Sequence, residues 1–181
     1  RNIDFDYVDY KLGVCESSYK IIREWLIADW CTNTQIYCNQ TIKVVDEVGP
    51  QVSCPPNDTF SVNSSNCLGE AIAPNPLDYV IPGGECGSVA QVDVLVKRGA
   101  PDCTPESAAD ETTEGVIKLP NGDYRVINLP LGCNWIIYKY TDACGNVTEC
   151  RYDVFIQEDQ KPVAVCDQHT TVTLTTQGKA K

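Results

Sequence analysis

The chain has 181 residues, of which 43% are hydrophobic, and its net charge is −11 at neutral pH. This length can bury the core of one domain, or of one domain and part of another. The acidic balance argues against nucleic-acid binding, because phosphate contacts need clustered Lys and Arg. No apolar run approaches the roughly 18–20 residues of a membrane helix. The sequence contains no Met and starts at Arg1, so we expect a processed product or a part of a longer protein.

The sequence holds eleven cysteines and a single histidine. This cysteine density is typical of disulfide-bonded proteins in oxidising compartments. Zinc knuckles and redox motifs use C-x2-C-type pairs, whereas the tightest pair here has five residues between its cysteines. We therefore predict a secreted, extracellular or cell-surface protein with structural disulfides. The odd number indicates that at least one cysteine has its partner outside this sequence.

Short runs rich in Val, Ile, Tyr and Thr, separated by turn residues, predict strands along most of the chain. Residues 20–30 (KIIREWLIADW) are the one stretch where a helix is a serious alternative. Residues 88–97 alternate as a half-buried strand does. Residues 115–130 and 134–157 each predict two strands around a turn, at Asn121-Gly122 and Gly145-Asn146 respectively. The fold class predicted from this pattern is an all-β sandwich.

An internal repeat divides the chain. The segment CNQTIKVVDEVGPQVSC (38–54) matches CRYDVFIQEDQKPVAVC (150–166) at an offset of 112, and WLIADWC (25–31) matches YKYTDAC (138–144) at an offset of 113. A period near 112 residues is the length of a whole domain. We therefore interpret 1–46 as the closing strands of a partial module, 47–159 as a complete module and 160–181 as the first strand of a following module.

The complete module resembles the hyalin-repeat (HYR) family. The resemblance covers about 47–162 and is weakest over 68–120. The matching positions are Asp46, Pro50, Cys54-Pro55, Leu129-Pro130, Gly132, Tyr138, Thr141-Asp142, Gly145-Asn146, Cys150 and Tyr152. Leu129 replaces the usual aromatic residue, and the cysteines at 133 and 144 are additions to the family pattern. The resemblance implies an immunoglobulin- or fibronectin-like sandwich that occurs in tandem, as in large cell-surface adhesins or fibres of Bacteroidetes-type bacteria.

If the module is such a sandwich, the directions of its strands restrict the disulfides. Three pairs are expected: Cys54 with Cys150, Cys86 with Cys144, and Cys103 with Cys133. Two alternatives stay open, since Cys133 can also pair with Cys67, and Cys144 can bond locally to Cys150.

The repeat also predicts two cysteines with partners outside this sequence. Cys166 is the equivalent of Cys54, so its partner is expected in a following module. Cys38 likewise needs a partner in a preceding one. Missing strands are expected from identical or similar modules, either by covalent continuation or by strand addition from other subunits.

No residues are singled out as catalytic or cofactor-binding. His169, the only histidine, is expected to be a surface residue rather than a catalytic base. Asn-x-Ser/Thr sequons at Asn39, Asn57, Asn63 and Asn146 are possible glycosylation sites. Calcium is a minor expectation at the module junctions, where Asp46, Glu158 and Asp159 lie; in the acidic loop 102–114, Asp102, Asp110 and Glu111 match no EF-hand spacing.

The predicted function is a structural or adhesive repeat unit of an extracellular fibre or giant surface adhesin, without catalytic activity. The alternative is a ligand-binding ectodomain module that recognises a glycan or a protein through the loop end that holds Cys86 and Cys144. A third hypothesis is a non-catalytic accessory domain of a secreted enzyme.

Overall fold

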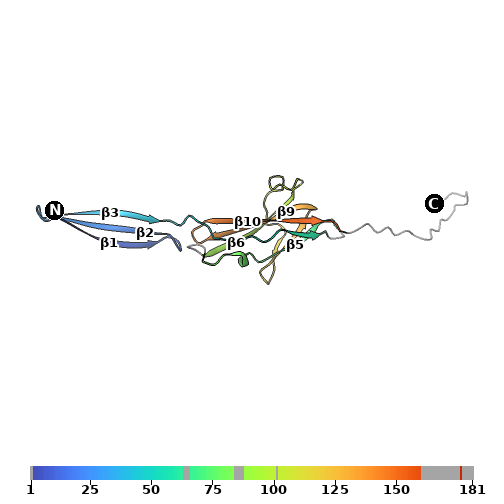
Figure 1. Ribbon diagram of the computed structural model, residues 1–181, viewed down its shortest axis with the longest axis horizontal. Coiled ribbons are helices and arrows are strands. Elements are labelled where there is room, and N and C mark those ends of the chain that lie inside the picture. Colours follow the sequence, from blue (N-terminus) through green and yellow to red (C-terminus); the bar gives the residue numbers. More distant parts are fainter. Residues whose placement is uncertain (1, 63–65, 84–87, 101, 160–175, 177–181) are drawn as a thin grey trace.

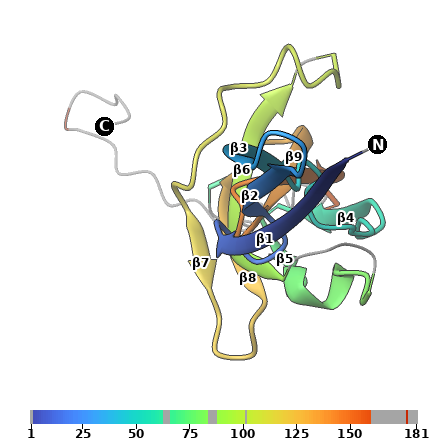
Figure 2. The ribbon, with the colours of Figure 1, turned by 90° about the vertical axis from the view of Figure 1, so that its left-hand side faces the viewer.

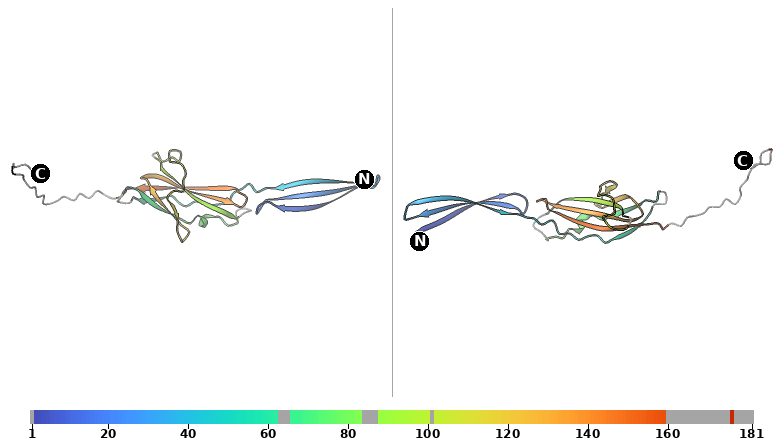
Figure 3. Two further views of the ribbon diagram at one scale, coloured as in Figure 1. Left: turned by 180° about the vertical axis from the view of Figure 1, so that it is seen from behind. Right: turned by 90° about the horizontal axis from the view of Figure 1, so that it is seen from above.

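The computed structural model describes residues 2–62, 66–83, 88–100, 102–159 and 176. Within these ranges the chain forms ten β-strands and one short 3-10 helix. They assemble into two bodies that lie end to end along the long axis of the molecule, a single sheet at the N-terminal end and a sandwich next to it (Figure 1). The views from behind and from above show the same arrangement (Figure 3).

The first body is an antiparallel sheet of three strands in the order β1-β2-β3. Each of its strands has 11 residues; they are β1 (Ile3–Gly13), β2 (Tyr19–Asp29) and β3 (Thr34–Val44). The stretch for which a helix was a serious alternative is β2, and it is the central strand of this sheet. Its β-branched and aromatic residues suit a strand that has a neighbour on each side.

The second body is a sandwich of two sheets. The four-stranded sheet has the order β4-β10-β9-β6, and the three-stranded sheet has the order β5-β8-β7. The strands of the larger sheet are β4 (Asp58–Ser61), β6 (Val89–Ala100), β9 (Gly132–Asp142) and β10 (Val147–Gln157). Those of the smaller sheet are β5 (Gly69–Ala73), β7 (Val116–Lys118) and β8 (Tyr124–Leu129). The 3-10 helix η1 (Pro76–Tyr79) follows β5. The predicted disulfide-rich, all-β sandwich is therefore confirmed.

Both predicted turns join neighbouring strands. Gly122, in the turn between β7 and β8, has a φ of 95°, and Gly145, in the turn between β9 and β10, has a φ of 88°. This left-handed region is open to Gly without steric cost. Figure 2, a view along the long axis, shows the β7–β8 hairpin projecting from one side of the sandwich.

The core lies between the two sheets of the sandwich and contains side chains from both. Its buried members are Val62, Ala71, Ala73, Val94, Val96, Val126, Leu129, Ile136, Tyr138, Tyr140, Cys150, Tyr152, Val154 and Ile156. The buried tyrosines keep their hydroxyl groups satisfied: Tyr138 donates to the carbonyl oxygen of Pro74 at 2.7 Å, and Tyr140 to that of Pro76 at 2.9 Å. These bonds attach the segment around η1 to the central strand β9.

Candidate functional site

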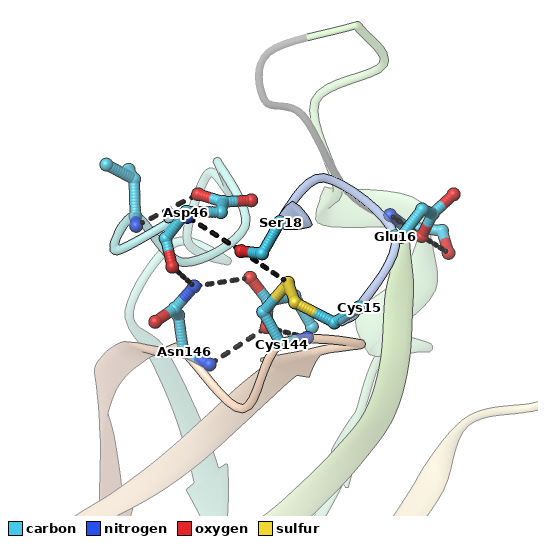
Figure 4. The surroundings of a disulfide bond; sticks show 9 residues. Cys15, Glu16, Ser18, Asp46, Cys144 and Asn146 are labelled. Atoms are coloured by element: carbon cyan, nitrogen blue, oxygen red, sulfur yellow. Dashed lines mark hydrogen bonds between the residues drawn. A yellow bond between two sulfur atoms is a disulfide. The ribbon is translucent and has the colours of Figure 1, made fainter. Parts of the chain in front are cut away.

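The candidate site is the junction between the three-stranded sheet and the sandwich. The turn between β1 and β2 meets the turn between β9 and β10, and a disulfide joins Cys15 in the first turn to Cys144 in the second (Figure 4). The two cysteines are separated by 129 residues, and their Cα atoms are 5.2 Å apart. This bond fixes the end of one body against the end of the other.

A hydrogen-bonded bridge runs beside the disulfide and includes the linker between the bodies. The backbone N–H of Asp46 donates to the hydroxyl oxygen of Ser18 at 2.8 Å. The side-chain amide of Asn146 donates to the carbonyl oxygen of Asp46 at 3.1 Å. Ser18 is buried. The linker is therefore held from both sides, by the β1–β2 turn and by the β9–β10 turn.

The carboxylate of Asp142 organises the β9–β10 turn. It accepts hydrogen bonds from the backbone N–H groups of Cys144 and Asn146, both at 2.8 Å, and from the side-chain amide of Asn146 at 2.9 Å. Burial opposes ionisation of this group, but the hydrogen bonds from Asn146 and Cys144 prevail and hold the pKa of Asp142 below its usual value. The turn that carries Cys144 is thus locked by one ionised side chain.

The linker passes very close to the first residues of β10 at Gly49. A Cβ atom at this position would lie 2.5 Å from the hydroxyl oxygen of Thr148 and 2.9 Å from the backbone carbonyl carbon of Val147. Only glycine fits without displacement of the backbone. Pro50, the next residue, is buried. Together they fix the path of the chain into the sandwich.

A further contact connects the β1–β2 turn to the sandwich. The carboxylate of Glu16 accepts hydrogen bonds from the backbone N–H of Ser88 at 2.9 Å and from its hydroxyl at 2.8 Å. These two bonds lower the pKa of Glu16. Ser88 directly precedes β6, so the turn contacts two different connections of the sandwich. A cleft of about 380 Å³ lies at the end of the three-stranded sheet that faces the junction, and Val14, Tyr19, Val44 and Val45 line its apolar part.

Within the described residues, one face of the three-stranded sheet is uncovered and rich in apolar side chains. Phe5 and Tyr7 on β1 contact the ring of Trp25 on β2, with ring centroids 6.2 and 5.1 Å apart. Phe5 is 66% exposed and Ile36 on β3 is 61% exposed. Arg23 lies over the ring of Tyr7 at 4.0 Å on the same face. Exposed aromatic and aliphatic groups at this density are typical of an interaction surface.

This uncovered face occupies the position of the core face in the sandwich. In the first body Tyr7, Trp25 and Cys38 are cross-strand partners on β1, β2 and β3. In the sandwich the cross-strand partners Val94, Tyr138 and Cys150 lie in the same order on β6, β9 and β10. Trp25 precedes Tyr138 by 113 residues and Cys38 precedes Cys150 by 112, which are the offsets of the sequence repeat. The turn in the second hairpin is therefore one residue shorter, and the register of the two hairpins is otherwise the same.

Two of the three expected disulfides are present. Cys54 is bonded to Cys150, and Cys103 is bonded to Cys133. The alternative partner of Cys133, Cys67, is exposed and carries no disulfide among the described residues.

The pairing expected for Cys144 is wrong. Cys144 bonds to Cys15 rather than to Cys86, and the local bond between Cys144 and Cys150 does not form either. Strand directions within one sandwich restrict only pairs inside that sandwich, whereas this disulfide crosses to the preceding sheet. Cys86 lies outside the described residues. Cys144 lies in the turn at the end of the sandwich that faces the β1–β2 turn, and only this location could have indicated a partner beyond the module.

The cysteines expected to have partners elsewhere have different outcomes. Cys38 is exposed and has no disulfide within the described part of the chain. Cys166 lies outside the described residues, as does His169. Cys31, the counterpart of Cys144, is also exposed and without a disulfide there.

The four sequons lie in different surroundings. Asn39 is exposed on β3. Asn57 exchanges two hydrogen bonds with Asp153, at 2.8 and 2.9 Å. Asn146 uses its amide nitrogen, the atom that a glycan would modify, in the two junction hydrogen bonds described above. Asn63 lies outside the described residues.

Of the residues considered for calcium, Asp159, Asp102 and Glu111 make other contacts, whereas Oδ2 of Asp46 is buried and has no hydrogen-bond partner among the described residues. Asp159 accepts hydrogen bonds from Ser61 and Gln157 at the far end of the sandwich. Asp102 accepts from Thr104 and Ser107 within its own loop, and Glu111 forms an ion pair with Lys139 at 2.8 Å. Among the described residues no group of three or more His, Cys, Asp and Glu side chains could hold a metal ion.

No protein-family model matches this sequence, and a search of curated proteins finds no significant match. The resemblance to the hyalin-repeat family therefore stays a prediction. Within the described residues no helix is long and apolar enough to cross a membrane.

Proposed function

We propose that this chain is a structural or adhesive repeat unit of an extracellular fibre or giant cell-surface adhesin, without catalytic activity. The observation that carries the proposal is the disulfide-bonded junction between the three-stranded sheet and the sandwich, whose corresponding strands share one cross-strand register. A disulfide, a hydrogen-bonded linker and a glycine at close approach all restrict motion at this one place. A joint that resists bending is what a load-bearing array of modules requires.

The matching registers of the two hairpins support a tandem of immunoglobulin-like modules. The sandwich has β6, β9 and β10 in one sheet and β5, β8 and β7 in the other, which is the arrangement of strands C, F, G and B, E, D in that fold. The three-stranded sheet matches β6, β9 and β10 of the sandwich in cross-strand register. In this proposal 1–46 belongs to a neighbouring module whose other sheet comes from a further module or subunit.

The disulfides of the chain support an extracellular location. Three disulfides connect the described residues. Such bonds persist in oxidising compartments and are rare in the cytosol. The net charge of −11 favours solubility of the single unit.

The ligand-binding alternative requires a free loop end on the sandwich. That end is contacted by the β1–β2 turn, through the Cys15–Cys144 disulfide and the Glu16–Ser88 hydrogen bonds. The contact favours the structural proposal over recognition of a glycan or protein at this end.

Electron microscopy and analytical ultracentrifugation of the purified, non-reduced chain test the proposal. We expect concentration-dependent, elongated oligomers whose axial repeat matches the length of the two bodies. A discrete monomer at every concentration, in oxidising buffer, would contradict it.

A further inference from the structure

Cys38 and Cys150 occupy equivalent positions but differ in bonding. Each is the cross-strand partner of an aromatic residue, Trp25 for Cys38 and Tyr138 for Cys150. Cys150 is buried and bonded to Cys54, which lies just before β4. Cys38 is exposed and has no disulfide among the described residues. The first sheet thus presents one half of a disulfide that the sandwich has completed.

The outer edges of the two sheets also differ, because one is paired with a further strand and the other, within the described residues, is not. In the sandwich β4 runs parallel to β10 and covers its outer edge. The equivalent edge, on β3, has no partner strand within the described part of the chain, since β3 pairs only with β2. An exposed edge of 11 residues is a template for strand addition.

The segment 160–181 carries the sequence pattern of the strand that is missing from this edge. Pro162 and Cys166 match Pro50 and Cys54 at the offset of 112. At the same offset the apolar residues of β4 and its continuation, Phe60 and Val62, match Val172 and Leu174. Phe60 and Val62 both contact the core of the sandwich. The segment therefore has the cysteine and the apolar alternation that an edge strand on β3 would need.

The segment of the same molecule cannot reach this edge. Because the two bodies lie end to end (Figure 1), a return path from the end of β10 must pass the whole of β10 and then half of β3. At about 3.3 Å per residue, these stretches of ten and six residues span roughly 50 Å. The seven residues from Asp159 to Cys166 span at most about 25 Å when fully extended. If this segment occupies the β3 edge, it must therefore come from a second molecule.

We propose that residues 162–176 of a second copy add to the free edge of β3 as a parallel strand, and that Cys166 of that copy forms a disulfide with Cys38. This inference rests on the proposed function and specifies its intermolecular contact. The register follows from β4 and β10, where Val154 faces Asp58 and Ile156 faces Phe60. At the repeat offset of 112, Val154 and Ile156 of β10 correspond to Ile42 and Val44 of β3, and Asp58 and Phe60 of β4 correspond to Thr170 and Val172. Thr170 would therefore lie opposite Ile42, and Val172 opposite Val44.

The covalent step needs an oxidant, and a small-molecule disulfide of the extracellular medium supplies it. The thiolate of Cys38 attacks this disulfide and releases one reduced small thiol. The thiolate of Cys166 then attacks the mixed disulfide, forms the bond between the copies and releases the second small thiol. Two protein thiols are oxidised and one small disulfide is reduced to two thiols.

The contact is heterologous, because the edge and the added strand are different parts of the chain. In this contact each copy uses the edge of β3 at one end and residues 162–176, which follow the sandwich in the sequence. Repetition of such a contact along an elongated molecule gives an open filament when the rotation between copies does not close a ring.

The test uses the full chain in a buffer of oxidised and reduced glutathione, with non-reducing gel electrophoresis and mass spectrometry of proteolytic fragments. We expect a ladder of covalent multimers and a linked peptide pair that contains Cys38 and Cys166. Cys38→Ser and Cys166→Ser should each abolish the ladder. An equimolar mixture of the two variants should give a dimer and nothing longer, since each variant retains only one half of the contact.

Cys31→Ser is the matched control, because Cys31 is another exposed cysteine of the first sheet. Its ladder should equal that of the unsubstituted chain. A synthetic peptide of residues 160–176, added in excess to the Cys166→Ser chain, should become linked to Cys38 whether or not the other variants fold well. A ladder that persists in Cys38→Ser, or linked peptides that join Cys38 to a different cysteine, would overturn the inference. Filaments without a Cys38–Cys166 link would leave the proposed function standing and remove this contact, whereas a monomer in all conditions would remove both.

Discussion

The side-chain amide of Asn146 donates a hydrogen bond to the carbonyl oxygen of Asp46, 100 residues earlier in the chain, at 3.1 Å. The same nitrogen donates to the carboxylate of Asp142 at 2.9 Å. One amide group therefore connects the linker between the two bodies with the turn that carries Cys144.

Replacement of Asn146 by Ala should destabilise the sandwich and its junction. The carboxylate of Asp142 loses a donor and the carbonyl of Asp46 loses its partner, for which we expect a cost of about 1–3 kcal/mol in the free energy of unfolding. Urea denaturation followed by tryptophan fluorescence measures this cost. Asn39→Ala, at an exposed sequon on β3, is the control and should change stability by no more than about 0.5 kcal/mol.

Removal of the junction disulfide by the double substitution Cys15→Ser and Cys144→Ser should loosen the joint. The chain-entropy model gives up to about 5 kcal/mol for a loop of this size. Small-angle X-ray scattering should show a broader distribution of dimensions, and limited proteolysis should cut the linker 45–49 faster. The double variant Cys103→Ser and Cys133→Ser removes a disulfide within the sandwich; it should lower the melting temperature without changing the cleavage of the linker. Equal linker cleavage in both double variants would contradict a specific role of the junction bond.

Substitution of Gly49 by Ala should be unusually costly for so small a change. The new methyl group would meet the hydroxyl of Thr148 and the backbone of Val147, and the backbone cannot give way as a flexible side chain can. Overpacking of this kind costs about 1–3 kcal/mol. Gly13→Ala is a matched control, because nothing lies within 4 Å of a Cβ atom at Gly13. In thermal unfolding, Gly49→Ala should have a lower melting temperature than Gly13→Ala. Equal melting temperatures would mean that the linker can shift to accommodate the methyl group.

Acidification should weaken the junction before it unfolds the rest of the sandwich. The pKa of Asp142 is lowered in the folded chain, so its stabilising contribution is present above its unfolded pKa of about 3.9 and is lost as pH falls through the lower folded value. Hydrogen exchange of the amides of Cys144 and Asn146 at pH 5 and at pH 2.5 tests this direction, since the protection of both amides should be lower at pH 2.5. Asp142→Asn should remove most of the difference between the two pH values.

Alkaline conditions should destabilise the core through its buried tyrosines. Burial raises the pKa of Tyr152 to about 12 and that of Tyr138 further still. The unfolded chain ionises its tyrosines near pH 10, so stability falls from about pH 10 upward by up to about 1.4 kcal/mol per pH unit for each buried tyrosine. The midpoint of urea unfolding between pH 9 and pH 11.5 measures the slope. Tyr152→Phe should reduce the slope, and an unchanged slope would contradict the assignment to this residue.

Most strands could be predicted from local patterns. The alternation in 88–97 and the glycine turns at Gly122 and Gly145 correspond to β6 and to the hairpins β7–β8 and β9–β10. The stretch 20–30 remained ambiguous, because its apolar residues suit a helix as well as a strand until neighbouring strands supply hydrogen-bond partners on both sides.

The disulfide pairings show which features the sequence by itself determined and which only the tertiary structure decided. The number and spacing of the cysteines indicated a disulfide-bonded chain, and the repeat indicated two equivalent hairpins. The strand directions expected inside one sandwich favoured the pairs Cys54–Cys150 and Cys103–Cys133 but left Cys67 open as a partner of Cys133 and Cys144 as a partner of Cys150. The partner of Cys144 depended on how two bodies meet in space. Strand direction carries no information across a junction, so only the tertiary structure could bring Cys15 within bonding distance.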